Sequence, residues 1–133
     1  MIKPDFTETL IRDKTVSVIG AGGWGTALST VLVKNGFNVK IWAFEKETVN
    51  EINNNHRNST FLPNIEISDK IQATNNLDDF RDEEFIITAI PTQYIRSLFQ
   101  NNHFDFKNKY ILNIAKGIEK NTLLRCSQIF AEL

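Results

Sequence analysis

The feature that most constrains this chain is a glycine motif placed between a strand-like and a helix-like segment. Residues 20–25 read Gly-Ala-Gly-Gly-Trp-Gly, which is the pattern G-x-G-x-x-G. The apolar segment 15–19 leads into this motif, and residues 24–35 follow it with apolar residues at helical spacing. A strand, a tight glycine turn and a helix N-terminus together form a binding site for the pyrophosphate of a dinucleotide. The motif therefore predicts the first unit of an α/β fold and also a ligand.

The three glycines of the pattern are expected to serve different purposes. Gly20 permits the tight turn out of the strand, and Gly22 lets the backbone approach the pyrophosphate closely because it has no Cβ. Gly25 lets the following helix pack closely against the sheet. The helix N-terminus then offers unpaired N–H groups and a partial positive charge to the phosphates. Without a ligand, the same residues would form only a glycine-rich turn.

The rest of the sequence alternates between strand-like and helix-like segments. Four further strands are expected at residues 38–42, 71–74, 84–90 and 110–115. Near-continuous apolar runs, such as residues 85–90, suit strands that are buried on both faces of a parallel sheet. The alternation predicts an α/β fold in a single domain, a doubly wound parallel sheet of the Rossmann type with helices on both faces.

Helical patterns fill most of the connections between these strands. They cover residues 24–35, residues 46–55, one turn at 77–80 and a short helix after Pro91. A last helix is expected to have Asn121 as its N-cap and an inward face made of Cys126, Ile129, Phe130 and Leu133. Residues 56–70 are expected to form an irregular excursion anchored by the apolar residues Phe61, Leu62, Ile65 and Ile67.

Length, charge and cysteine content exclude several classes of protein. The chain has 133 residues and a net charge of −1, so it suits one domain with no strong attraction to nucleic acid or to an anionic membrane. A single cysteine, Cys126, rules out an internal disulfide. We divide the chain into an N-terminal extension, residues 1–14, and one dinucleotide-binding domain, residues 15–133.

Targeting and metal-binding signals are not found in this sequence. Residues 1–14 lack the apolar segment of a signal peptide, and no apolar run is long enough to span a bilayer. Both observations favour a cytoplasmic protein. His56 and His103 are isolated in polar stretches, so no metal site is expected.

Residues after the second strand bear on the choice of cofactor. An acidic residue about 20 positions after the glycine motif binds the ribose hydroxyls in NAD-binding proteins. Glu45 fits that position, although it could also be a solvated glutamate in the first turn of a helix. Lys46 could instead attract a 2′-phosphate, so NADP(H) stays open beside NAD(H). Two large rings near the same edge, Phe44 and Trp24, could cover the cofactor or pack against the protein.

Two further strand ends carry candidate binding residues. In an open α/β sheet, ligands bind outside the carboxyl ends of the strands. The fourth strand ends in Pro91, followed by Thr-Gln and Tyr94, and the fifth ends in Ala115, Lys116 and a glycine. Lys116 would face the cleft and could bind a carbonyl or phosphate oxygen. On spacing alone, a solvated lysine is the simpler interpretation, because charged residues are mostly exposed.

Five segments together resemble the N-terminus of NAD(P)-dependent glycerol-3-phosphate dehydrogenase. They occur in that family's order and spacing, from about Lys14 to the end of the chain: residues 18–28, 41–45, 58–63, 90–94 and 115–119. The glycine motif alone is common to dinucleotide-binding proteins. The segments W-x-F-E, F-L-P, I-P-x-Q and K-G-I-E are much more specific in combination.

The resemblance implies an enzyme that reduces glycerone phosphate to sn-glycerol 3-phosphate with a nicotinamide cofactor, and whose product feeds phospholipid synthesis. It implies that Lys116 contacts both substrate and cofactor, which favours a functional lysine there. It also implies that several residues at the strand ends line the cofactor cleft. With the glycine motif and the acidic position included, the expected cofactor-binding residues are Gly20, Gly22, Gly23, Trp24, Gly25, Phe44, Glu45, Pro91, Tyr94 and Lys116.

The chain also departs from the family in informative ways. Many bacterial members have serine in place of Gly23 and a basic residue near Phe44, so the sequence leans toward NAD(H). The family has a helical C-terminal domain that supplies the catalytic lysine and the substrate-phosphate contacts. We therefore expect this chain to hold the cofactor half of the site, to contain no catalytic residue and to be inactive alone. A homodimer would form through that helical domain.

Two other functions are compatible with the residues. A non-catalytic dinucleotide-binding module would use the same glycine loop. A methyltransferase also pairs a glycine loop with an acid after the second strand, but it has no use for the K-G-I-E segment.

Overall fold

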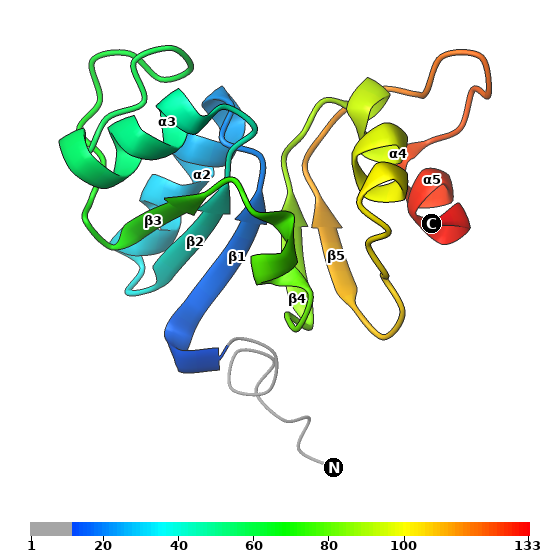
Figure 1. The fold of residues 1–133 in the computed structure, drawn as a ribbon, viewed down its shortest axis with the longest axis horizontal. Coiled ribbons are helices and arrows are strands. Elements are labelled where there is room, and N and C mark those ends of the chain that lie inside the picture. The colour runs from blue at the N-terminus through cyan, green and yellow to red at the C-terminus, as the bar shows by residue number, and fades with distance from the viewer. Residues whose placement is uncertain (1–11) are drawn as a thin grey trace.

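A computed structural model describes residues 12–133, in which five parallel strands form one sheet (Figure 1). The order across the sheet is β3-β2-β1-β4-β5, and every neighbouring pair is parallel. This order confirms the predicted doubly wound sheet of the Rossmann type. Most of the expected extension, residues 1–14, lies outside the described residues. The strands are β1 (Thr15–Ile19), β2 (Asn38–Trp42), β3 (Ile71–Thr74), β4 (Phe85–Thr88) and β5 (Tyr110–Asn113).

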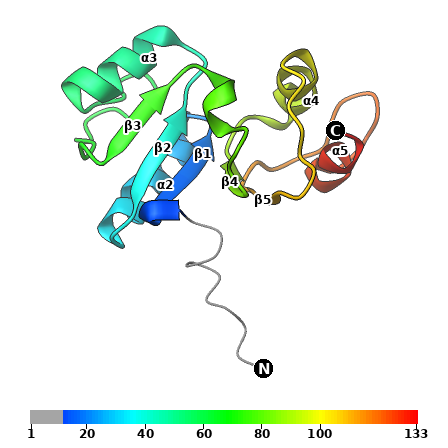
Figure 2. The same ribbon diagram turned by 60° about the horizontal axis from the view of Figure 1, so that its bottom comes forward.

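The helices divide between the two halves of the sheet. Helices α2 and α3 lie beside the half made by β1, β2 and β3, whereas α4 and α5 lie beside β4 and β5 (Figures 1 and 2). Their bounds are α2 (Gly23–Lys34), α3 (Lys46–Asn50), α4 (Thr92–Asn101) and α5 (Cys126–Glu132), with shorter helical turns η1 (Arg12–Lys14), η2 (Glu51–Asn55) and η3 (Leu77–Phe80).

Alternate strand residues build two separate cores, one on each face of the sheet. Val16 and Val18 of β1 belong to the core that packs against α2, whereas Ile19 belongs to the core that packs against α4 and α5. Ile87 and Ile86 of β4 divide in the same way. The near-continuous apolar runs of the sequence therefore correspond to strands that are buried on both faces.

The last helix begins later than predicted. Asn121 is not its N-cap; α5 begins at Cys126 and its N-cap residue is Arg125. Asn121 and Leu123 both have left-handed φ angles, of 69° and 59°, so the backbone turns repeatedly before it can enter a helix. The inward face is as predicted, because Cys126 and Ile129 are buried.

Three other elements also differ from the sequence prediction. The helix expected at residues 46–55 changes at Glu51 from α3 to the π-type turn η2. The Asn53 side chain in this turn accepts from the Ala73 N–H at 2.7 Å and donates to the Ala73 carbonyl at 2.9 Å, which fastens the turn to β3. Strands β4 and β5 end at Thr88 and Asn113, before the predicted ends at residues 90 and 115.

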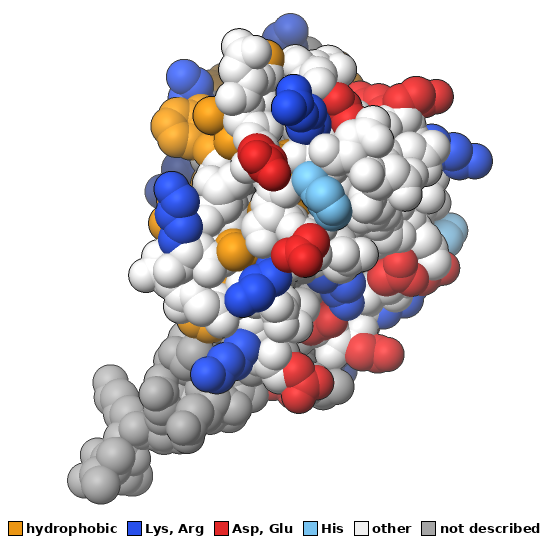
Figure 3. Space-filling view, turned by 90° about the vertical axis from the view of Figure 1, so that its left-hand side faces the viewer, with side chains coloured by type: hydrophobic (Ala, Val, Ile, Leu, Met, Phe, Trp, Pro, Cys, Tyr) orange, Lys and Arg blue, Asp and Glu red, His pale blue; other side chains and the backbone are white. Residues whose placement is uncertain are grey.

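The molecular surface carries charges of both signs. On the side that bears α3 and β3, acidic and basic side chains are interspersed (Figure 3). Within residues 12–133, no helix combines the length and apolarity needed to cross a membrane. The same residues contain no group of three or more His, Cys, Asp or Glu side chains placed to hold a metal ion.

Candidate functional site

The candidate site lies at the edge of the sheet where all five parallel strands end. The glycine loop, residues 20–25, follows the central strand β1, whose neighbours are β2 and β4. Because the chain crosses from one half of the sheet to the other between these strands, the loop occupies a topological switch point, where open α/β sheets bind ligands. Residues 44–45 follow β2 on one side of the loop, and residues 90–94 follow β4 on the other.

Gly20 and Gly25 make the tight turn that the sequence predicts. Gly20 has a φ of +122°, and a Cβ there would lie 2.7 Å from the backbone of Ala89. A Cβ on Gly25 would lie 1.9 Å from the Gly20 carbonyl oxygen and 3.1 Å from the Cβ of Ala89. The start of α2, the end of β1 and the end of β4 therefore pack backbone against backbone, which only glycine allows.

Gly22 and Gly23 shape the open side of the loop. A Cβ on Gly22 would meet nothing within 4 Å, so this residue borders free space. Gly22 is the N-cap residue of α2; no side chain caps the helix, and no acidic residue lies in its first turn. The N-terminal N–H groups and the positive end of the helix dipole are therefore available to an anion. This arrangement fits the pyrophosphate of a dinucleotide.

A buried asparagine from a different segment of the chain makes hydrogen bonds to the glycine loop. Asn58 has no exposed surface, and its side-chain amide donates to the Ala21 carbonyl and to the Thr26 hydroxyl, each at 2.8 Å. The Thr26 hydroxyl donates in turn to the Ala21 carbonyl at 3.2 Å. The Leu62 N–H donates to the Asn58 carbonyl at 2.8 Å and closes a turn, residues 58–62, against the loop. Buried polar groups that satisfy one another in this way hold a single geometry.

The 58–62 turn is itself held by a carboxylate. Glu51 accepts hydrogen bonds from the Ser59 hydroxyl and from the Ser59 N–H, the latter at 3.0 Å. The bonds from Ser59 lower the pKa of Glu51 below its ordinary range. The Phe61 carbonyl oxygen would lie only 3.0 Å from a Cβ on Gly23, so the turn also limits what residue can stand there.

The anchors of the 56–70 excursion were predicted only in part. Ile67 is buried, with 2% of its surface exposed, as expected. Phe61 and Ile65 are instead exposed, at 39% and 44%, and do not anchor the segment. Asn58 takes that place by hydrogen bonding rather than by apolar packing.

Three exposed aromatic rings lie at the same edge of the sheet as the loop. Trp24, Phe44 and Tyr94 are 79%, 75% and 64% exposed, which is unusual for side chains of this size. Trp24 is the second residue of α2 rather than the first, since the helix begins at Gly23. Phe44 packs edge-on against the buried Trp42, with ring centroids 6.3 Å apart. Large apolar rings exposed together at the strand ends are typical of a ligand-binding or interaction site.

The charged residues after β2 are exposed as well. Glu45 is the N-cap residue of α3, but its side chain does not cap the helix. Lys46 is the first residue of α3 and is also exposed. The Glu45 carboxylate makes no hydrogen bond or ion pair with another side chain between residues 12 and 133. It is therefore available to a ligand that carries hydroxyl donors.

Lys116 lies at the same edge, beyond β5. Its side chain is exposed, and the following Gly117 has a φ of +101°. Its carbonyl oxygen accepts a hydrogen bond of 2.8 Å from the hydroxyl of Thr92, the first residue of α4. Pro91 is the N-cap residue of that helix. The Thr92–Lys116 hydrogen bond therefore links the segment after β4 to the loop after β5. The structure thus brings all ten predicted site residues to one edge of the sheet, while their individual roles stay predictions.

Sequence reasoning missed Asn58, Thr26 and Gln93, whose side chains hold the loops of this edge in place. Each is a polar residue that bonds to a segment distant in sequence. No periodicity marks such residues, although all three lie inside the segments that carry the family resemblance.

Comparison with known sequences gives one consistent result. A family model described as the NAD-dependent glycerol-3-phosphate dehydrogenase N-terminus matches residues 15–133. A glycerol-3-phosphate dehydrogenase [NAD(P)+] of Carboxydothermus hydrogenoformans is 42% identical over 120 residues, covering 89% of this chain and 36% of the relative. The enzyme of the same name from Bacillus subtilis is 40% identical over 118 residues, covering 87% and 34%. The chain thus spans about a third of the length of these relatives.

Solved structures agree with the sequence comparison. A glycerol-3-phosphate dehydrogenase from Coxiella burnetii superimposes with a TM-score of 0.77 at 25% identity, covering 89% of this chain and 37% of the other. The corresponding structure from Saccharomyces cerevisiae gives a TM-score of 0.72 at 31% identity, covering 90% and 39%. An arogenate dehydrogenase from Synechocystis, at 15% identity and a TM-score of 0.60, shares the fold alone. The chain therefore belongs to the NAD-dependent glycerol-3-phosphate dehydrogenase family, and the part it represents is the N-terminal NAD-binding domain.

Proposed function

We propose that this chain is the cofactor-binding part of a glycerol-3-phosphate dehydrogenase that reduces glycerone phosphate to sn-glycerol 3-phosphate with NADH. The observation that carries the proposal is the glycine loop at the switch point, which leads into the uncapped N-terminus of α2. The family match over residues 15–133 supports a dehydrogenase that acts on glycerol 3-phosphate. A cytoplasmic location and a homodimer formed through the family's helical domain belong to the same proposal.

The proposed cofactor site uses the loop for the phosphates and the surrounding side chains for the remaining groups. Gly20 and Gly25 hold the turn, while Gly22 and Gly23 present backbone N–H groups to the pyrophosphate. Trp24, Phe44, Pro91 and Tyr94 offer apolar surface to the rings of the dinucleotide. NADH would supply the hydride for the reaction.

Two charged side chains would set specificity within this site. Glu45 would accept hydrogen bonds from the ribose hydroxyls and would repel a 2′-phosphate, which favours NADH over NADPH. Lys116 would bind an oxygen of the substrate, the cofactor or both through its ammonium group. A lysine suits that task because its ammonium is a compact point charge on a flexible stem.

Calorimetric titration of the chain with NADH and NADPH tests the cofactor assignment. We expect NADH to bind more tightly, and Glu45→Gln to weaken NADH by about tenfold, the equivalent of one lost charged hydrogen bond. Glu66→Gln is the matched control, since Glu66 is an exposed glutamate of the 56–70 excursion. No binding at millimolar NADH or NADPH would refute the function. Rapid NADH oxidation with glycerone phosphate by this chain alone would refute the expectation that it holds only the cofactor half.

A further inference from the structure

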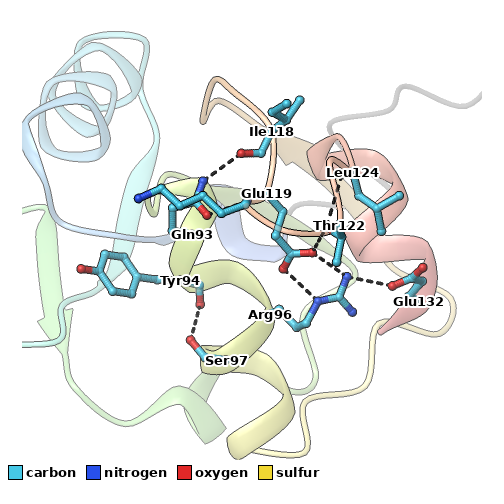
Figure 4. A network of polar contacts seen from close by, with 10 residues as sticks. Gln93, Tyr94, Arg96, Ser97, Ile118, Glu119, Thr122, Leu124 and Glu132 are labelled. Carbon is cyan, nitrogen blue, oxygen red and sulfur yellow. Dashed lines mark hydrogen bonds and ion pairs between the residues drawn. The ribbon is translucent and has the colours of Figure 1, made fainter.

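The first turn of α4 makes hydrogen bonds to the loop that carries Lys116. The Gln93 side chain uses both ends of its amide on this loop, residues 116–120 (Figure 4). Its Nε2 donates to the Ile118 carbonyl at 2.8 Å, and its Oε1 accepts from the Lys120 N–H at 2.9 Å. The exposed Gln93 side chain thus donates one bond to the loop backbone and accepts one from it, as a paired strand residue does.

A second contact from the same turn fixes the other end of the loop. Thr92 is 4% exposed, and its hydroxyl donates to the Lys116 carbonyl at 2.8 Å. Between the two contacts lies Gly117, whose φ of +101° is rare for other residues and whose missing Cβ leaves the backbone more conformational freedom. Ile118 is 49% exposed, so little apolar packing restrains this stretch. Its far end is held by backbone pairing, since Ile118 bridges to Arg125 and the Glu119 N–H donates to the Leu124 carbonyl at 2.8 Å. Hydrogen bonds from α4 therefore act together with this pairing in setting the path of the loop on the side of Lys116.

The base of the loop is anchored separately by an ion pair. Arg96 of α4 makes a two-pronged contact with the Glu119 carboxylate, at 2.8 and 2.9 Å, and a further contact of 2.8 Å with Glu132 of α5. The bonds from Arg96 and then from Thr122 lower the pKa of Glu119. Glu119 is only 8% exposed. Paired charges in this setting are costly to separate, so this contact secures the fold rather than the lysine.

We propose that Gln93 is a positioning residue for Lys116. Its amide bonds to the backbone of Ile118 and Lys120. These two bonds restrict the backbone conformations that Gly117 would otherwise allow at the neighbouring Lys116. The ammonium group is then confined to the edge of the sheet that also carries the glycine loop and the 90–94 segment. A side chain ordered before binding loses less entropy when it meets a ligand. This inference rests on the proposed role of Lys116, and it adds a residue whose only route to the ligand is through that lysine.

The location of Gln93 makes a role in folding alone a poor explanation. Its side chain is exposed, whereas α4 is secured by the buried Ile95 and Phe99 further along the helix. Phe99 packs against the Phe104, Phe106 and Phe130 rings at centroid distances of 5.4, 4.6 and 6.0 Å. Figure 4 also shows the Tyr94 ring pointing away from the network, so the helix presents different side chains to the loop and to the open edge.

A double-mutant cycle on the chain itself tests the proposal. The variants are Gln93→Ala, Lys116→Ala and the double variant, and the measured quantity is the dissociation constant for NADH from calorimetry. We expect each single variant to weaken NADH by about three- to tenfold, and the double variant to be no weaker than Lys116→Ala alone within about twofold. Gln100→Ala, an exposed glutamine on the same helix, is the control and should bind like the unmodified chain.

Each other outcome has a defined meaning. If the loss of NADH affinity in the double variant equals the product of the losses in the two single variants, Gln93 acts independently of the lysine and the proposal is overturned. Unchanged affinity in Gln93→Ala, or in Lys116→Ala, would also overturn it while leaving the dinucleotide site in place. Failure of every variant and of the unmodified chain to bind NADH would instead refute the proposed function. Thermal melting of all variants excludes loss of the fold as the cause.

Discussion

Replacement of Asn58 tests whether directed hydrogen bonds, rather than packing, hold the glycine loop. The side-chain amide of this residue donates both of its N–H groups to buried acceptors, the Ala21 carbonyl and the Thr26 hydroxyl, each at 2.8 Å. Aspartate has the same shape, but an ionised carboxylate can only accept. Asn58→Asp would therefore set a carboxylate oxygen against the Ala21 carbonyl oxygen with no proton between them.

The structure sets the order of the expected losses. Asn58→Ala removes the two bonds that the amide donates and a longer bond, of 3.4 Å, that its oxygen accepts from the Phe61 N–H; the Ala21 carbonyl keeps the Thr26 hydroxyl as a donor at 3.2 Å. At about 1 kcal/mol for each donated bond and little for the long one, the free energy of unfolding should fall by about 2 kcal/mol. Asn58→Asp should cost about 3–5 kcal/mol, because it buries a charge against the Ala21 carbonyl oxygen with only the distant Phe61 N–H as a backbone donor. The isosteric substitution should therefore be worse than truncation.

Urea denaturation at pH 7 and at pH 5 measures these differences. Burial beside the Ala21 carbonyl oxygen, with one long bond from the Phe61 N–H, raises the pKa of the introduced carboxyl above its unfolded value, so its cost should shrink as the pH falls. The cost of Asn58→Ala, taken relative to the unmodified chain, should not change with pH. Asn54→Ala, at an exposed asparagine of η2, is the control. If Asn58→Asp proves as stable as Asn58→Ala at pH 7, the directed hydrogen bonds do not hold the loop.

Two further predictions concern the same edge of the sheet. Gly25→Ala should abolish NADH binding and lower the melting temperature, because the new Cβ would lie 1.9 Å from the Gly20 carbonyl oxygen. Gly22→Ala is the control and should melt like the unmodified chain, because its Cβ would have nothing within 4 Å. Equal melting of the two variants would contradict this packing argument. The hydrogen bonds from Ser59 lower the folded pKa of Glu51, so their stabilisation is present above the ordinary glutamate pKa and is lost as the pH falls through and below about 4. Over that pH range, the melting temperature of Glu51→Gln should fall less than that of the unmodified chain. If the two plots of melting temperature against pH are parallel, Glu51 is not a source of acid sensitivity.

Local sequence patterns predict the strands near the glycine motif well. The predicted bounds of β1 and β2 agree with the structure because each strand is a short apolar run next to a glycine turn. The first helix, expected at residues 24–35, ends next to Gly36, whose φ of +90° favours glycine. The strand-end residues could be assigned to one edge because parallel strands all finish there. These features depend on neighbours in sequence or on the topology of the sheet.

The features that the sequence did not reveal are contacts between distant segments. Asn58 bonds to Ala21, 37 residues earlier, and Gln93 bonds to Ile118, 25 residues later. A single polar side chain has no periodic signature, so burial through hydrogen bonds cannot be read from local spacing. The wrong N-cap at Asn121 has a related cause. Asparagine favours helix caps and left-handed turns alike, and here the turn prevails.

The exposure of Trp24 gives the chain a built-in optical probe. Its two tryptophans occupy opposite environments, since Trp42 is 6% exposed within a core and Trp24 is 79% exposed beside the glycine loop. The emission of Trp42 would report on unfolding, whereas that of Trp24 would change when a molecule settles against the loop. With Trp42→Phe, the remaining fluorescence would come from a single indole at the ligand edge. Binding and stability could then be followed separately in one cuvette, without any attached dye.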